Sequence, residues 1–216
     1  MSPQEQLENG LREMQLALPA AVQEKLLAYV ALLYKWNKTY SLTALKEQDK
    51  AVSHHLLDSL SILPFIPAGR LLDVGSGGGT PGIPLAIARP DVAVTLLDSN
   101  TKKTAFLQQA AIELGLRNIS VHAGRVEQYH PPVGFEAVTS RAFAELADFV
   151  ALSAHLLAEH GAWLAMKGVY PQAEIERLPS GIAVDAVHRL KVPELEAERH
   201  LVVLRRTTAK TAKTAN

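Results

Sequence analysis

The sequence predicts an α/β fold: a mostly parallel sheet with an antiparallel last strand, preceded by a helical N-terminal extension. Before residue 67, apolar residues recur at helical spacing, as in Leu26, Leu27, Val30 and Leu33. After Gly69, short apolar runs alternate with helical stretches, a pattern typical of parallel strands joined by right-handed crossovers. The last two apolar runs have no long helical pattern between them, which indicates a hairpin.

Each expected element follows from its local pattern. Two prolines and a glycine in residues 64–69 end a helical extension over residues 1–66. Apolar runs then predict strands at 70–75, 92–98, 119–122, 135–140, 162–167, 182–190 and 200–206. Helical spacing predicts helices near 82–89, 101–114, 145–159 and 172–178. The sheet domain thus covers 67–206, and the low-complexity segment 207–216 is expected to be a flexible tail.

Composition limits the possible functions. Lys and Arg number 22, as do Asp and Glu, so any nucleic-acid surface must come from uneven placement of charge. The chain of 216 residues has no cysteine, which excludes disulfides, thiolate metal sites and a cysteine nucleophile. No secretory signal and no apolar run long enough to span a membrane are visible, so we expect a cytoplasmic domain without a membrane partner.

A glycine-rich loop, LLDVGSGGGTPGIP, follows the first expected strand and opens a helix. Such a loop lets the backbone approach a ligand at a helix N-terminus. The dinucleotide fingerprint G-x-G-x-x-G is matched by Gly77, Gly79 and Gly82, with Asp98 after the next strand. An acid followed by G-x-G-x-G, the nucleoside-binding loop of class I methyltransferases with their Rossmann-like sheet, is matched equally by Asp73, Gly75, Gly77 and Gly79.

Three observations favour the methyltransferase interpretation. The carboxylate of Asp73 would repel a pyrophosphate, whereas it suits a cofactor that carries an amino group. Too few residues follow Gly69 for a separate substrate domain. A Y-x-x-x-K pair, Tyr34 and Lys38, resembles that of short-chain dehydrogenases but lies upstream of the glycine loop, which is the wrong order. A Gly/Pro turn without a ligand remains the alternative.

Asp98 ends the second expected strand. A carboxylate there can accept both ribose hydroxyls of an adenosyl group. The alternative is an N-cap for the helix starting at Thr101, a role that Ser99 or Asn100 could supply instead.

Six segments together resemble one known family: WNKTYSLTAL (36–45), HHLLDSL (54–60), LDVGSGGGTPGIPLAI (72–87), VTLLDSNTKKTAFLQ (94–108), GRVEQY (124–129) and SRAF (140–143). They closely resemble the bacterial small-subunit rRNA guanine-N7 methyltransferases, also called glucose-inhibited division protein B. The resemblance covers roughly residues 26 to 168, and it departs at Ser41, where the family pattern has Asn.

The resemblance implies methyl transfer from S-adenosylmethionine to N7 of one guanine in the decoding-region loop of 16S rRNA. The partner would be 16S rRNA, within the small ribosomal subunit or an assembly intermediate. By position, the family's cofactor contacts fall on Gly75, Thr80, Asp98, Val126, Glu127 and Arg141.

The same residues also have a local interpretation. A backbone N–H and a carboxylate at Val126 and Glu127 can bind the adenine edge, although Glu127 could equally be a solvated loop acid. Arg141 ends a strand, where its guanidinium could bind the cofactor carboxylate or an RNA phosphate; a surface salt bridge is the alternative. Phe143 is a candidate for stacking on the target base, and a core phenylalanine is at least as consistent with the sequence.

The chemistry limits the acceptor. Without cysteine, methylation at C5 of pyrimidines is excluded, and the only Pro-Pro pair lies before the fourth strand, not in the motif of exocyclic-amine enzymes. Guanine N7 has an exposed lone pair, so we expect no catalytic acid or base, only alignment of the methyl carbon with N7 and sulfur. A small-molecule or protein methyltransferase, and a non-catalytic RNA-binding assembly factor, remain alternatives.

Two further groups of residues are singled out. His54, His55 and Asp58 could suggest a metal or acid–base site, but capping or core hydrogen bonding is the expectation and no metal is predicted. Basic clusters that suit an RNA backbone, or simply a solvated surface, comprise Lys102, Lys103, Arg205, Arg206, Lys210 and Lys213.

Overall fold

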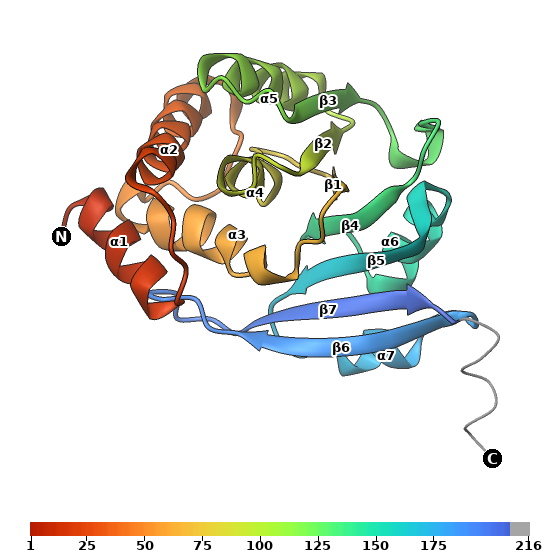
Figure 1. The fold of residues 1–216 in the computed structure, drawn as a ribbon. Helices are drawn as coiled ribbons and strands as arrows, with labels where there is room; N and C mark the ends of the chain where they lie inside the picture. Colours follow the sequence, from red (N-terminus) through yellow and green to blue (C-terminus); the bar gives the residue numbers. More distant parts are fainter. Residues whose placement is uncertain (208–216) are drawn as a thin grey trace.

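Seven strands form a single sheet in the order β3-β2-β1-β4-β5-β7-β6 in the computed structural model, which describes residues 1–207 (Figure 1). They are β1 (Arg70–Val74), β2 (Ala93–Asp98), β3 (Ile119–Ala123), β4 (Phe135–Arg141), β5 (Leu157–Lys167), β6 (Ile182–Leu190) and β7 (Arg199–Arg206). Strands β1 to β5 pair in parallel, whereas β7 is antiparallel to both β5 and β6. The mostly parallel sheet with an antiparallel last strand is therefore confirmed. Apart from Thr207, the expected tail, with Lys210 and Lys213, lies outside the described residues.

The N-terminal extension is helical, as expected. It consists of α1 (Pro3–Glu13), α2 (Ala20–Tyr40), a 3-10 turn (Gln48–Lys50), a π-helical segment (Val52–Leu57), α3 (Asp58–Leu60) and a second 3-10 turn (Leu63–Phe65). Helix α1 begins with a capping box in which the Ser2 hydroxyl accepts the Glu5 N–H and the Glu5 carboxylate accepts the Ser2 N–H. Helix α2 ends at Tyr40 and is capped by Ser41, whose backbone is left-handed at φ 51° and ψ 54°.

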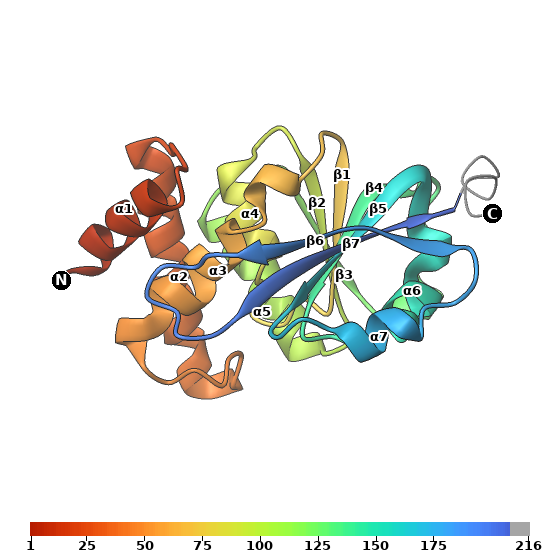
Figure 2. The same ribbon diagram turned by 90° about the horizontal axis from the view of Figure 1, so that it is seen from below.

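Helices cover both faces of the sheet, and Figure 2 shows them as two separate layers. On one face, the extension packs with α4 (Gly82–Ala88) and α5 (Thr101–Glu113) over Leu71, Leu96 and Leu164. On the other, α6 (Leu146–Ser153) and α7 (Gln172–Glu176) cover Val74, Val138 and Trp163. The extension thus shares a hydrophobic cluster with the sheet.

The region before β5 differs from the expectation. The helix predicted over 145–159 ends at Ser153, a 3-10 turn follows at Ala154–Leu156, and β5 begins already at Leu157. Leu157 pairs with Phe135 of β4, next to an irregularity in the strand register. The local sequence has helical spacing here, but pairing with β4 makes the segment a strand. The helix predicted at 172–178 is likewise shorter and ends at Glu176.

The parallel arrangement brings the carboxyl ends of β1 to β5 to a common edge. The glycine loop after β1, Asp98 in β2, the turn after β3 and Arg141 in β4 all lie there. The extension reaches this edge too, because the buried hydroxyl of Tyr29 in α2 donates to the main-chain oxygen of Gly78 at 2.6 Å. In α/β folds this edge is where ligands bind.

Candidate cofactor site

Left-handed backbone shapes the glycine loop. Gly75, Gly77 and Gly79 have φ of 70°, 55° and 97°, values that side chains disfavour. A Cβ atom on Gly75 would lie 2.8 Å from the ring of Phe143, so the absence of a side chain at Gly75 allows Phe143 to approach the loop.

Asp73 lies beneath this loop with no exposed surface. Its Oδ2 accepts the N–H of Gly82 at 3.0 Å, while its Oδ1 has no protein partner. Burial raises the pKa of Asp73 to about 7, although the hydrogen bond from the Gly82 N–H favours the charged form. The side chain therefore supports the loop from behind and does not line the pocket in front of it.

Asp98 lies at the front of the loop. Asp98 is 8% exposed, and its carboxylate accepts the N–H of Gly77 at 2.8 Å and that of Asn100 at 2.9 Å. The cap of α5 is Asn100, whose side chain accepts the N–H groups of Lys102 and Lys103. The structure thus gives the N-cap role to Asn100, one of the two candidates named for it, and leaves the Asp98 carboxylate facing the pocket.

A pocket of about 360 Å³ opens in front of the glycine loop. Of the predicted site residues, it brings together Gly75, Asp98, Val126, Glu127 and Phe143. Asp73, Gly77, Thr80 and Arg141 do not line this pocket. Gly77 and Thr80 belong to the loop itself, Asp73 accepts the N–H of Gly82 from beneath it, and Arg141 contacts it through Thr80.

Sequence reasoning missed several residues of this pocket. Ser99, Gly124, Arg125 and Ala142 line it, and each comes within two residues of the end of a parallel strand. Because ligands of α/β folds bind at the carboxyl ends of the parallel strands, these residues could have been identified from the sequence by their position alone. Lys103, predicted only as part of a basic cluster, lines the pocket as well. No local signal marked Leu97 within β2 or Leu152 in α6.

The far wall of the pocket comes from the loops after β3 and β4. Val126, 4% exposed, begins a short 3-10 turn, and the half-exposed carboxylate of Glu127 lies 3.9 Å from Arg125. Phe143 is 36% exposed and packs edge-on against Phe149, with 6.3 Å between the ring centroids. Phe143 is therefore partly supported by the core and partly open at the pocket.

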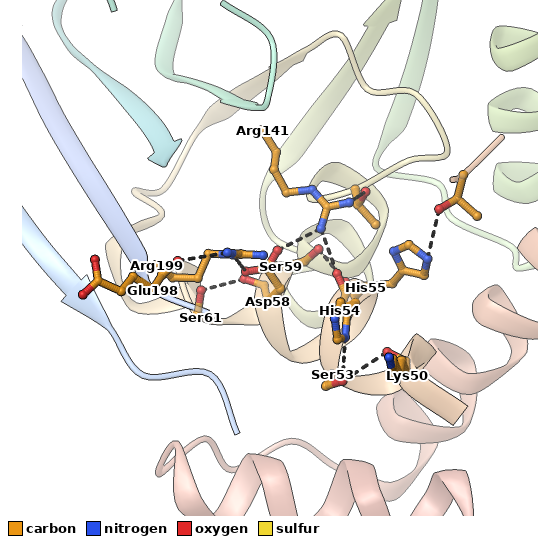
Figure 3. Close-up of polar contacts among 12 residues, drawn as sticks. Lys50, Ser53, His54, His55, Asp58, Ser59, Ser61, Arg141, Glu198 and Arg199 are labelled. Atoms are coloured by element: carbon orange, nitrogen blue, oxygen red, sulfur yellow. Dashed lines mark hydrogen bonds and ion pairs between the residues drawn. The ribbon is translucent and has the colours of Figure 1, made fainter. Parts of the chain in front are cut away.

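Arg141 forms a separate polar cluster with His54 and Asp58 of the extension (Figure 3). Arg141 Nη1 donates to the carboxylate of Asp58 and to the main-chain oxygen of His54, each at 2.9 Å, and Nη2 donates to the Thr80 hydroxyl. Asp58 and His55 are buried, and Asp58 takes part in core hydrogen bonding as expected. Within residues 1–207, no three His, Cys, Asp or Glu side chains gather as a metal site requires.

The arginines of β7 are engaged within the fold. Arg205 pairs with Asp185 at 3.0 Å, while Arg206 donates to main-chain oxygens that precede and begin β5 and lies over the Trp163 ring. Of the other predicted basic residues, Lys103 lines the pocket and Lys102 precedes it in α5. No helix of the described chain is long and apolar enough to cross a membrane.

The pocket fits an adenosyl cofactor. The pocket is lined by the backbone of Gly75, the carboxylate of Asp98 and the apolar side chain of Val126, a combination that suits a ribose and a purine. Together with a sheet in which β7 is inserted antiparallel, these features define a class I S-adenosylmethionine-dependent methyltransferase. Solved structures share this fold: a methyltransferase of Geobacter sulfurreducens in complex with S-adenosyl-L-homocysteine aligns with TM-score 0.54 and 16% identity, covering 79% of this chain and 97% of that one. One from Aquifex aeolicus aligns with TM-score 0.55 and 15% identity, covering 80% and 97%.

Sequence comparison gives the particular family. The family model for rRNA small subunit methyltransferase G matches residues 22–202. The ribosomal RNA small subunit methyltransferase G of Neisseria meningitidis serogroup C is 59% identical over 95% of this chain and 100% of its own length. That of Laribacter hongkongensis is 55% identical over 94% and 99%. The chain belongs to the rRNA small subunit methyltransferase G family, and the predicted family, enzyme class and cofactor are confirmed.

Proposed function

We propose that this chain transfers the methyl group of S-adenosylmethionine to N7 of a guanine in the decoding-region loop of 16S rRNA. The substrate would be the small ribosomal subunit or an assembly intermediate, and the enzyme would act in the cytoplasm. The observation that carries this proposal is the pocket at the carboxyl edge of the sheet, in a chain whose family acts on small-subunit rRNA.

Different residues of the pocket contact different parts of the cofactor. Asp98, whose carboxylate is already fixed by two backbone N–H groups, accepts the ribose hydroxyls. Val126 and Glu127 bind the adenine edge, and Gly75 allows the backbone to lie against the cofactor. S-adenosylmethionine supplies a methyl group activated by a sulfonium, so the protein itself needs to bind and orient rather than to form a covalent intermediate.

The acceptor is held at the mouth of the pocket. Phe143, open to the pocket on one side and supported by Phe149 on the other, stacks on the target guanine. Lys103 and Arg125, at the same mouth, contact RNA phosphates, which gives a neutral chain a local positive surface. Guanine N7 attacks with its own lone pair, and alignment supplies the rate enhancement.

The decisive experiment is methyl transfer from labelled cofactor. Naked 16S rRNA, the 30S subunit and an assembly intermediate are offered in parallel, and the product is mapped by strand cleavage at N7-methylguanine. Label in one guanine of the decoding-region loop is the expected result. Cofactor-independent RNA binding without transfer would instead favour an assembly factor. An RNA affinity that does not depend on salt would favour a small-molecule methyltransferase, because phosphate contacts release counterions.

A further inference from the structure

Asp58 in the helical extension joins three parts of the fold through a single carboxylate. Its Oδ2 accepts from Nη1 of Arg141 and its Oδ1 from Nε of Arg199, each at 2.9 Å (Figure 3). These partners lie 83 and 141 residues away in the chain, at the end of β4 and the start of β7. We call the group of Asp58, Arg141 and Arg199 the Asp58 cluster.

The Asp58 cluster carries an excess of positive charge. Asp58 is 1% exposed, and a buried carboxylate is stable only when it is well paired. One arginine would neutralise it, yet two are present, and both guanidinium-bearing side chains remain 25% exposed. Within the Asp58 cluster itself one positive charge is thus left over, and Asp73, beneath the glycine loop, is the further acid that interacts electrostatically with Arg141.

Arg141 is the member of the cluster that faces the glycine loop. Its guanidinium has five N–H groups, of which three are engaged by the Asp58 carboxylate, the His54 main-chain oxygen and the Thr80 hydroxyl. The acceptors lie on two sides, the extension and the glycine loop, so they fix the orientation of the guanidinium. Two N–H groups remain for an anionic ligand.

Arg199 makes an equivalent ion pair with Asp58 but does not contact the glycine loop. Its Nη1 donates to the main-chain oxygen of the neighbouring Glu198, not to the glycine loop. The two arginines therefore share the same carboxylate, the same distance and the same exposure, but only Arg141 reaches the cofactor loop.

We propose that Asp58 is a positioning residue of the cofactor site. Its carboxylate holds the guanidinium of Arg141 against the glycine loop, where the two remaining N–H groups bind the carboxylate end of the cofactor. The helical extension is then a part of the cofactor site and not only a neighbour of it. This inference rests on the proposed function for the identity of the ligand.

The test measures the dissociation constant of S-adenosylhomocysteine by calorimetry, without RNA. In Asp58→Asn both ion pairs lose the negative charge, and only one of the two side-chain atoms can still accept a hydrogen bond. Arg141 is then held less firmly against the glycine loop, and the constant should rise by about tenfold or more. Arg199→Met is the matched control: it also removes one ion pair of Asp58 but leaves the Arg141 pair, and its constant should stay within about twofold of the wild type.

A double-mutant cycle asks whether Asp58 acts through Arg141. Arg141→Met leaves Asp58 paired with Arg199, so the chain keeps one neutralising partner for the buried acid. Adding Asp58→Asn to Arg141→Met should then change the dissociation constant little further, because both substitutions remove the same contribution. Additive effects, equal effects of Asp58→Asn and Arg199→Met, or a lower melting temperature with unchanged affinity would each overturn the inference.

A spectroscopic measurement on the wild-type chain covers the case in which Asp58→Asn does not fold. Guanidinium ¹⁵N resonances of Arg141 and Arg199 are assigned from the two Met variants. S-adenosylhomocysteine should shift the Arg141 resonances and leave those of Arg199 nearly unchanged, whereas an unshifted Arg141 would overturn the proposal. Neither readout uses RNA, so a failure of rRNA methylation with these binding effects intact would contradict the proposed substrate and not the role of Asp58.

Discussion

The carboxylate of Asp98 accepts the backbone N–H of Gly77 at 2.8 Å, which joins the end of β2 to the glycine loop of β1. The same carboxylate accepts the N–H of Asn100 at 2.9 Å. Two backbone donors therefore fix the orientation of its oxygens before any ligand arrives. A carboxylate held in this way is preorganised to accept hydroxyl groups, because little side-chain entropy is lost when they bind.

Asp98→Ala should weaken cofactor binding by about 1–3 kcal/mol, since the ribose hydroxyls lose a charged acceptor. Asn100→Ala is the matched control: it removes the cap of α5, which costs about 1 kcal/mol of stability, without removing the acceptor. Calorimetry and thermal melting on both variants separate the two roles. If Asn100→Ala lost the cofactor and Asp98→Ala did not, the assignment of Asp98 to ribose would be wrong.

Gly75→Val should abolish cofactor binding while the fold persists. A Cβ atom at Gly75 would meet the Phe143 ring at 2.8 Å, so the substitution pushes Phe143 or itself into the pocket. Gly115→Val tests the strain alone, because Gly115 has a similar φ of 63° and a Cβ atom there would have no neighbour within 4 Å. Both variants should lose stability, and only Gly75→Val should lose affinity in a calorimetric titration.

Ser41→Asn should stabilise the chain by up to about 1 kcal/mol. Ser41 caps α2 in the left-handed region, where most L-residues cost about 1–2 kcal/mol and Asn is tolerated better. The Asn that the family pattern has here is thus explained by the backbone. Ser41→Val, with a branched Cβ, should shift the urea midpoint in the opposite direction; equal midpoints for the two variants would contradict this account.

Acidification should destabilise the fold through His55. Burial, reinforced by the nearby charges of Arg141 and His54, lowers the pKa of His55 to about 4. In the unfolded chain this histidine gains a proton as the pH falls through about 6.5, while the folded chain does not until about pH 4. Its contribution to stability is therefore lost over that window.

His55→Gln should remove this dependence. Between pH 7 and 5, the free energy of unfolding should fall by about 2 kcal/mol more in the wild type than in the variant. Urea denaturation at both pH values measures the difference, and taking it between the two proteins cancels the opposite trend of Asp73, whose raised pKa stabilises the fold as the pH falls. Parallel pH profiles would show that His55 is protonated in the folded chain.

Local sequence patterns predicted the parallel strands and the glycine loop because each depends on neighbours in the chain. Short buried apolar runs between turns, such as residues 70–74 and 93–98, form strands. The ends of these strands were predicted to within two residues. The start of β5 at Leu157 was not, because its conformation is decided by pairing with Phe135 across the sheet.

Some polar contacts of the site could likewise be predicted from the sequence, whereas others could not. Asp98 and the residues after β3 could be placed because strand ends share an edge of a parallel sheet. The contact of Tyr29 with Gly78 and the pairing of Asp58 with Arg141 join segments 49 and 83 residues apart. No periodicity or motif carries such pairings, so the role of the extension at the cofactor loop emerges only from the structure.

The chemical step should need no proton transfer to the protein. If the acceptor is guanine N7, its lone pair attacks without loss of a proton, and the product base carries the positive charge. No general base is then required, and no histidine lines the pocket within the described residues. Asp73, whose pKa burial raises to about 7, has no exposed surface and is unable to reach an acceptor.

Single-turnover rates at saturating RNA and cofactor should therefore be flat between about pH 6 and 9, since a general base would contribute about 10²–10⁴-fold. Replacing His54, His55 or His130 with Gln should leave these rates unchanged. Saturation matters because RNA binding depends on charge and could imitate a catalytic ionisation. A part of the pH–rate profile with unit slope that disappears when one histidine is replaced would demonstrate proton abstraction. It would point to an exocyclic amine or a hydroxyl as the acceptor.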